Sequence, residues 1–255
     1  MKETRSLLNN LVVCGVALAM VSTLAAQTVT QGAAKVVRVR GAARYSTGNN
    51  IWQPLKVGDV VKPGTVIQTA AKSSVDLALG DGSTPVVRPV PVEMPSYMPT
   101  AEQDMVRIWE NTVLGVDKMT STETGADVVT ETQLDLKAGH IFGMVKKMSA
   151  ASKYEVKIPN GVAGIRGTTY DISAEGVVKV FVGSVVLAYV GPDGTVVTQV
   201  VMTLQQFDAR TGVLSSLSDF DRDAFRRLVA QLPSGFTPAP RVLSTDKTLN
   251  FVSPH

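Results

Sequence analysis

The sequence predicts an all-β protein with one helix near its C-terminal end. Short runs alternate apolar and polar residues, as in Val75 to Leu79, where Val, Leu and Leu alternate with Asp and Ala. These runs are separated by turn-forming pairs such as Asp81-Gly82 and Asn160-Gly161. An amphipathic segment follows at 218–232. Short alternating strands between such turns are typical of sandwiches and barrels. We therefore expect a two-layer, β-sandwich-like fold, with a short right-handed β-helix as the alternative.

The N-terminal residues have the plan of a secretory signal peptide. Lys2 and Arg5 precede an apolar stretch from Leu11 to Leu24, and Ala25-Ala26 follows it. This order predicts cleavage after Ala26. A membrane span needs about 20 apolar residues, and this stretch is shorter, which favours a cleaved signal. An uncleaved inner-membrane anchor is the alternative. We expect a periplasmic or secreted protein with no membrane span once the signal is removed.

Composition excludes several classes of protein. The single cysteine, Cys14, lies inside the expected signal, and the Val13 before it is larger than a lipoprotein signal requires. Cleavage after Ala26 leaves a chain without disulfides, held together by its core alone. The 25 basic and 22 acidic residues of the whole chain become 23 and 21. This near balance gives no reason to expect nucleic acid as a partner.

The β domain is expected to span residues 34–204. Its first half contains Trp52 close to Leu55, which predicts an apolar anchor in the core. Residues 84–127 break the pattern, because they contain five prolines that cannot donate to a sheet. We interpret this stretch as an insertion, with a short helix through Met105, Ile108 and Trp109.

Strands resume at Val128. Beyond them, Ser218 is a good N-cap, and Asp219 and Asp221 suit the first turn of a helix over 218–232. An apolar stripe completes that helix (Ala224, Phe225, Leu228, Val229, Leu232). Residues 233–255 have the composition of a flexible tail.

Catalytic chemistry is hard to place. The only histidines are His140 and His255, and no cluster of Cys, His and carboxylate residues has metal-ligand spacing. No glycine-rich phosphate loop and no nucleophile elbow is present. His140 follows a turn and is expected to be a hydrogen-bonded strand-end residue. We therefore expect no enzyme activity, no cofactor and no metal.

One glycine-rich segment stands out between two predicted strands. Gly161, Gly164 and Gly167 fall within seven residues, with Arg166 and Thr168 beside the last of them. Closely spaced glycines indicate a tight turn or a close approach of backbones. We expect Arg166 to point inward and pair with a buried carboxylate. Presentation of its guanidinium to a partner is the alternative.

Two blocks of sequence, roughly 36–83 and 134–190, contain short motifs in a characteristic order. The first block includes Trp52-Gln53-Pro54-Leu55 and Val57-Gly58-Asp59. The second block contains the continuous run from Ile158-Pro159-Asn160-Gly161 to Thr168. Together they resemble the FecR domain family of bacterial envelopes.

The resemblance implies an extracytoplasmic module. The best-known members follow a cytoplasmic anti-sigma segment and a membrane helix, and relay a signal from an outer-membrane transporter. Only about ten residues precede the apolar stretch here, so direct regulation of a sigma factor is not expected. We expect a non-enzymatic protein-interaction, signalling or scaffolding module with an envelope protein as its partner. The alternative is a glycan- or peptidoglycan-binding module that uses exposed aromatic residues (Tyr45, Trp52, Tyr97, Trp109).

Overall fold

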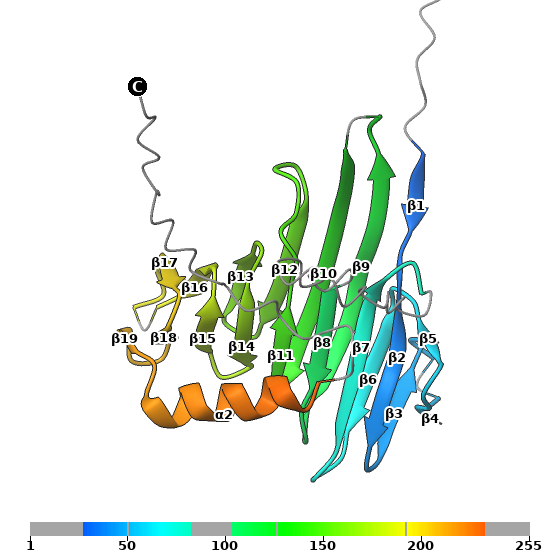
Figure 1. The fold of residues 1–255 in the computed structure, drawn as a ribbon, viewed down its shortest axis with the longest axis horizontal. Coiled ribbons are helices and arrows are strands. Elements are labelled where there is room, and N and C mark those ends of the chain that lie inside the picture. Colours follow the sequence, from blue (N-terminus) through cyan, green and yellow to red (C-terminus); the bar gives the residue numbers. More distant parts are fainter. Residues whose placement is uncertain (1–27, 50, 83–103, 126, 192, 233–255) are drawn as a thin grey trace, which may run out of the picture.

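A computed structural model of the chain describes residues 28–232, except for residues 50, 83–103, 126 and 192. The expected signal peptide, the proline-rich part of the expected insertion and the expected tail lie outside the described residues. The described part consists of two β-sheets and one helix (Figure 1), which confirms the all-β prediction.

The two sheets, here called sheet A and sheet B, have ten and nine strands. Sheet A has the order β17-β16-β13-β12-β10-β9-β6-β3-β4, and β1 also pairs with β9. Its strands are β1 (Val29–Gln31), β3 (Ala43–Ser46), β4 (Gln53–Pro54), β6 (Thr65–Thr69), β9 (Val113–Glu123), β10 (Val128–Ala138), β12 (Lys153–Ile158), β13 (Gly161–Ile165), β16 (Ser184–Val190) and β17 (Val196–Met202).

Sheet B has the order β19-β18-β15-β14-β11-β8-β7-β2-β5. Its strands are β2 (Ala33–Arg40), β5 (Val60–Val61), β7 (Ser74–Gly80), β8 (Asp104–Ile108), β11 (His140–Met144), β14 (Thr169–Ser173), β15 (Val177–Val182), β18 (Gln205–Asp208) and β19 (Val213–Ser216). The chain passes repeatedly from one sheet to the other and adds strands in order along the long axis (Figure 1). Neighbouring strands are antiparallel except β10 and β12.

The core lies between the two sheets and is made by one side of each strand. Val75, Leu77 and Leu79 of β7 point into it, as the alternation predicts. Near the middle of the core, the buried hydroxyl groups of Tyr154 and Tyr170 lie 3.1 Å apart. Burial raises the pKa of both tyrosines, which therefore stay neutral and serve as packed, hydrogen-bonded core residues.

The helix α2 (Asp219–Ala230) forms a third layer on the outer face of sheet B (Figure 1). This confirms the predicted helix and its N-cap, because Ser218 Oγ accepts a hydrogen bond from the Asp221 backbone N–H at 3.1 Å. The ring of Phe225 stacks on that of Phe181 at 4.3 Å between centroids. Phe142 lies beside both rings, so an aromatic cluster attaches the helix to β11 and β15.

The helix expected through Met105, Ile108 and Trp109 was wrong. Residues 104–108 form β8 and residues 113–123 form β9, and both lie in the interior of their sheets. Met105 packs in the cluster under α2, whereas Val106 points into the core between the sheets. Both faces of β8 are therefore buried, which hides the strand alternation. This part of the expected insertion, 84–127, belongs to the β domain.

Gly143 is needed where β11 crosses Tyr170. A Cβ atom at residue 143 would overlap the ring and hydroxyl of Tyr170. We predict that Gly143→Ala displaces Tyr170 and lowers the free energy of unfolding by about 2–3 kcal/mol. Gly164→Ala is the matched control, since the nearest atom to its Cβ, Val186 O, would be 3.6 Å away. Chemical denaturation of the two variants tests this, and equal stability would contradict the packing argument.

Candidate functional site

The glycine-rich segment 161–168 forms the crossover from sheet A to sheet B. Gly161 lies against β16 so closely that a Cβ would overlap the Ala188 carbonyl oxygen. Gly167 has a φ of 61°, in the left-handed region that favours glycine. Thr168 is buried, and its hydroxyl donates to the Ser184 carbonyl at 2.8 Å. These residues therefore build the turn that joins β13 to β14.

Arg166 does not have the expected inward position. Its side chain is exposed, and Nη2 donates to the Ser149 carbonyl oxygen at 3.0 Å rather than to a buried carboxylate. The expectation rested on the apolar neighbours Val162 and Ile165. Ile165 is buried, but residue 166 lies just after the end of β13, where the chain leaves the sheet and its side chain points to solvent.

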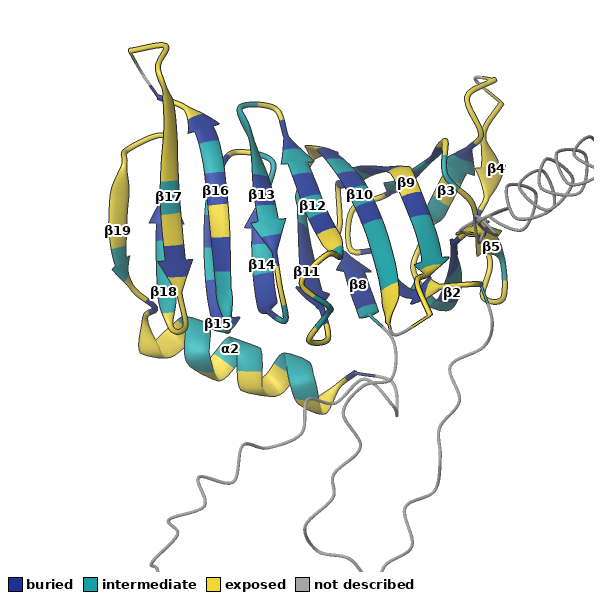
Figure 2. Ribbon diagram, turned by 90° about the horizontal axis from the view of Figure 1, so that it is seen from above, coloured by how far each residue is buried: buried dark blue, intermediate teal, exposed yellow. Residues whose placement is uncertain are grey.

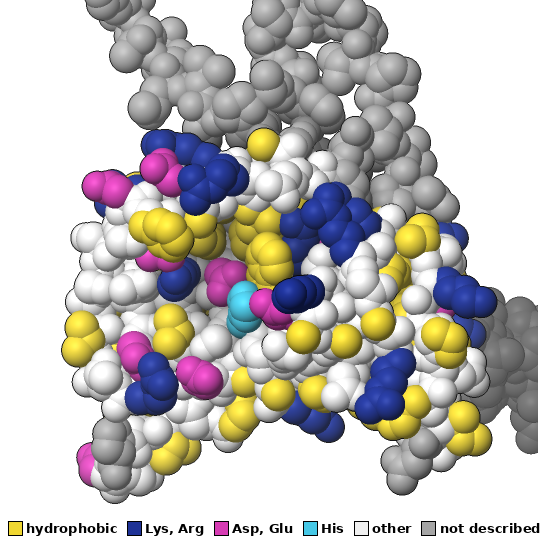
Figure 3. All heavy atoms as spheres, turned by 90° about the horizontal axis from the view of Figure 1, so that it is seen from below, with side chains coloured by type: hydrophobic (Ala, Val, Ile, Leu, Met, Phe, Trp, Pro, Cys, Tyr) yellow, Lys and Arg dark blue, Asp and Glu magenta, His cyan; other side chains and the backbone are white. Residues whose placement is uncertain are grey.

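A hollow of about 230 Å³ lies between α2 and the outer face of sheet B. Asp171 on β14 and Lys179 on β15 line it from the sheet, and Asp221 lines it from the helix. Lys179 Nζ lies 2.6 Å from the Asp221 carboxylate, so an ion pair closes one side. His140 stacks on Trp109 with 5.6 Å between ring centroids. Figure 3 shows the imidazole at the surface of this face, with acidic side chains beside it.

The ionisable groups of this hollow are perturbed. Burial raises the pKa of Asp171 to about 7, although Lys179 and the Trp109 indole lower it. Burial lowers the pKa of His140, and the positive charge of Lys179 lowers it further. The negative charge of Glu110 raises this pKa, but its effect is smaller. Burial also opposes ionisation of Asp221, but Lys179 and Ser218 bring its pKa below the usual range. Near neutral pH, only Asp171 of these three groups is close to half ionised.

A second hollow, of about 510 Å³, lies on sheet A beside the edge strand β4. Trp52 lines it and is 38 % exposed, so the expectation that Trp52 belongs to the core was wrong. Leu55 is buried as expected, but no strand lies beyond β4 to cover the indole. Instead Arg44 Cζ lies over the ring at 4.6 Å from its centroid.

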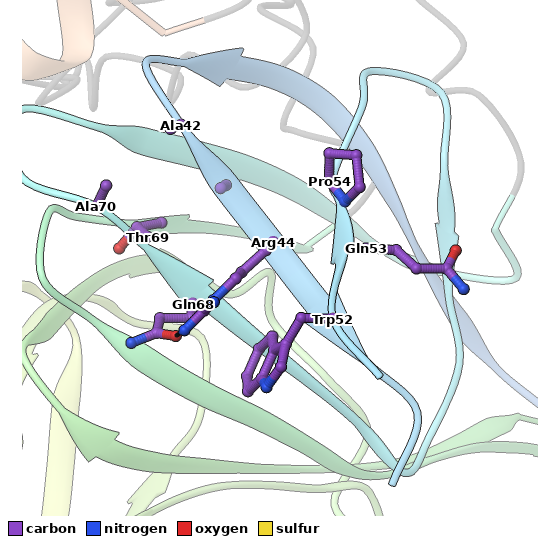
Figure 4. A pocket seen from close by; sticks show the side chains of 9 residues that line it. Ala42, Arg44, Trp52, Gln53, Pro54, Gln68, Thr69 and Ala70 are labelled. Atoms are coloured by element: carbon purple, nitrogen blue, oxygen red, sulfur yellow. Dashed lines mark hydrogen bonds between the residues drawn. The ribbon is translucent and has the colours of Figure 1, made fainter. Parts of the chain in front are cut away.

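This hollow, the Trp52 groove, has an ordered guanidinium. Arg44 Nε and Nη2 both donate to Gln68 Oε1, at 2.9 and 2.7 Å (Figure 4). Pro54 lines the groove from β4, whereas the Gln53 side chain points away from Arg44 and its Oε1 accepts a hydrogen bond from the Tyr45 hydroxyl at 3.2 Å. The remaining donors of Arg44 and the exposed part of the indole can contact a ligand that has both an apolar face and hydrogen-bond acceptors.

Comparison with known proteins finds a family likeness for the segment that contains the sheet B side of the first hollow. A model of the family described as FecR protein matches residues 99–186. This segment is a FecR domain. The match includes β8 to β15, the 161–168 crossover and the sheet B residues of the hollow, but not the Trp52 groove or α2. The family expected from the sequence is therefore confirmed.

Two solved structures are also similar to this chain. Both are crystal structures of a "putative anti-sigma factor" from Parabacteroides distasonis, with 15 % sequence identity and a TM-score of 0.36. The alignment covers 50 % of this chain and 57 % of that one, so the match spans little more than half of the other protein. No curated protein matches the sequence.

The described part of the chain contains no group of three or more His, Cys, Asp and Glu side chains placed to hold a metal. None of its helices has the length and hydropathy of a membrane span. Nothing in the sequence indicated that His140, Trp109 and Asp221 lie together in one hollow with Asp171 and Lys179. Asp171 and Lys179 alternate with core residues on their strands, and only the position of α2 shows that they are covered rather than solvated.

We predict that Asp171 makes the stability of the protein depend on pH. Its folded pKa lies above the ordinary value of 3.8, so the folded state holds this proton more tightly and loses stability as pH rises from about 4 through 7. Asp171→Asn removes that loss. Relative to the wild type, the variant should gain about 1–2 kcal/mol of unfolding free energy between pH 5 and 8, allowing for partial solvation.

Urea denaturation at several pH values measures this effect. Asp219→Asn is the control, because that carboxylate lies on α2, which packs over this face of sheet B, and is exposed. The His140 contribution is common to wild type and variant and cancels in the difference. Parallel stability curves for wild type and Asp171→Asn would show that this carboxyl group is not buried in the folded state.

Proposed function

We propose that this FecR protein is an exported, non-enzymatic interaction module that signals or scaffolds in the bacterial envelope. The observation that carries the proposal is the FecR domain at 99–186, the part of the chain with family likeness. The signal-peptide pattern of residues 1–26 supports a periplasmic or secreted location. An envelope protein is the partner that this combination favours.

The state of the titratable side chains supports binding rather than catalysis. In the hollow under α2, Lys179 is paired with Asp221 and His140 is stacked against Trp109. The Lys179–Asp221 ion pair joins the helix to the sheet, and the His140–Trp109 stack lies between neighbouring strands of sheet B, so both contacts serve the fold. A general base needs a partner group and a reachable substrate proton. The described residues of the hollow are arranged to hold α2.

The proposal predicts both export and a protein partner. The full chain with a C-terminal epitope tag, made in its own bacterium, should appear in the periplasm or the medium, with Gln27 as its first residue. Crosslinking in the intact cell should then capture the same envelope protein in replicate experiments. A cytoplasmic location, or capture of cell-wall material alone, would contradict the proposal.

The Trp52 groove favours a second function, glycan or peptidoglycan binding. Sugar rings stack on exposed aromatic side chains, and the remaining N–H donors of Arg44 can bind a carboxylate. Of the other aromatic candidates, Trp109 is stacked on His140, Tyr45 is partly buried and Tyr97 lies outside the described residues. Trp52 is therefore the residue on which this alternative depends.

Soluble muropeptides test the groove. If it binds them, they should quench or shift the Trp52 fluorescence, and Trp52→Ala should weaken binding at least about tenfold through loss of the stacking surface. Trp109→Phe is the control that removes the second indole and leaves the groove intact. Unchanged binding by Trp52→Ala, or no binding by the wild type, would exclude the groove as a glycan site.

A further inference from the structure

The two ends of the β domain differ in how their edge strands are protected. At one end, the edge strands β4 and β5 have two residues each, and Pro54, Lys56 and Lys62 lie in or beside them. Short strands, prolines and lysines are the usual means by which proteins block pairing at an edge. The edge strand β17 at the other end has seven residues, Val-Val-Thr-Gln-Val-Val-Met, with no charge and no proline.

The backbone of β17 shows which groups face outward. In an antiparallel pair, the N–H and C=O of a residue point to the same side and alternate along the strand. Gly191 N donates to Thr195 O at 2.8 Å, which makes this the first hydrogen-bonded pair of the β16–β17 hairpin. Every second residue from this pair onward is hydrogen-bonded to β16. The residues between them, Thr198, Val200 and Met202, therefore direct their backbone N–H and C=O groups to the free edge.

Two side-chain contacts agree with this phase. Gln199 Nε2 donates to the Val200 carbonyl at 2.7 Å, and Gln205 Oε1 accepts from Met202 N at 2.9 Å. Both backbone groups would be engaged with β16 in the opposite phase. Val196, Thr198, Val200 and Met202 therefore direct their peptide groups away from the sheet.

Sheet B extends one strand further than sheet A at this end. β17 packs over β15 and β18, and β19 lies beyond it (Figure 2). Leu214 of β19 pairs with Phe207, which is buried against Tyr189, so Leu214 is on the core-facing side of sheet B. Leu214 is nevertheless 41 % exposed, and Val197 on the core side of β17 is 38 % exposed.

We propose that this end of the domain binds an extended segment of a protein partner as an additional strand of sheet A. The segment pairs with β17, and its inward side chains cover Leu214 and Val197. The inference rests on the proposed interaction function and names the surface that carries it. It is a case of strand addition, in which backbone hydrogen bonds supply affinity and alternate side chains supply specificity.

The same geometry indicates the chemistry of the segment. No charged residue occurs from Thr195 to Gln206, so the paired part of the partner is expected to be uncharged and to alternate apolar residues. The nearby Arg210 is already paired with Asp208 at 3.0 Å. An ion pair from the partner is therefore not the main source of affinity.

A single strand fits this end better than a second copy of the chain. Two antiparallel β17 strands related by a two-fold axis would keep their core-facing sides on the same side of the joint sheet. Each copy has β18 and β19 at or beyond its own β17 on that side, so the two pairs of strands would occupy the same space. A segment without a second sheet avoids this overlap.

A synthetic peptide tests the proposal. The probe is Thr-Val-Thr-Val-Thr-Val-Thr with two lysines at each end, and the control peptide has proline at two adjacent central positions, which blocks pairing at both of its edges. At about 1 mM of the alternating peptide, we expect amide exchange at Thr198 and Val200 of the full chain to slow by about tenfold. The proline peptide should have no effect. Equal exchange with and without the alternating peptide would overturn the proposal.

Two variants locate the contact. Thr198→Pro removes an outward N–H while leaving the pairing with β16 possible, and should weaken peptide binding at least about tenfold. If that variant does not fold, Leu214→Lys places a charge under the added strand and should weaken binding similarly. Val60→Lys is the matched control, because Val60 is 47 % exposed on the edge strand at the opposite end. Unchanged binding by Leu214→Lys would overturn the proposal.

Other occupants give different results, each of which would overturn it. A second copy would slow exchange at Thr198 and Val200 as the protein concentration rises, without peptide. The chain's own residues 233–255 would do so at every concentration, and truncation after Leu232 would then speed exchange. In cells, the Thr198→Pro variant could still capture the envelope partner at wild-type levels. That result would overturn binding at β17 and leave the proposed function unchanged.

Discussion

The carboxylate of Asp76 organises the outer face of sheet B. It accepts hydrogen bonds from Arg107 Nε and Nη2 at 2.6 and 2.8 Å and from Arg38 Nε at 2.7 Å. Arg38 Nη2 continues to the Gln231 carbonyl at the end of α2, 2.8 Å away. Because Asp76 and Arg107 are both buried, loss of one charge would leave the other uncompensated in the interior. One side chain thus joins β2, β7 and β8 and fixes where the helix ends.

This network and the Lys179–Asp221 ion pair hold α2 near its two ends, with the Phe181–Phe225 stack between them. The helix therefore covers the middle of sheet B and buries much of the polar surface around Asp171 and His140. Surfaces that remain open for a partner lie elsewhere, at the Trp52 groove and at the β17 edge. The described β domain is therefore covered on one face by α2 and uncovered at the Trp52 groove and at the β17 edge.

Much of this fold could be predicted where one side of a strand meets solvent, because alternation then survives in the sequence. The Ser218 cap likewise marked the start of α2. Prediction failed at β8, where Met105 packs under α2 and Val106 packs in the core. Both faces of this strand are buried, and Met105 and Ile108 mimic helical spacing. Trp52 was misjudged because hydrophobicity does not reveal that β4 is the last strand of its sheet.

A sheet that grows strand by strand has two edges, and an edge can accept a further strand only where nothing blocks its outward backbone groups. The family match ends at residue 186, within β16, so β17 to β19 lie outside the matched FecR segment. The uncharged edge is thus formed by strands that follow the part of the chain with family likeness. Pro54 and the lysines next to β4 and β5 block pairing at the opposite end. In the proposed binding mode, the matched segment serves as the scaffold, and the strands that follow it provide the specificity for a partner.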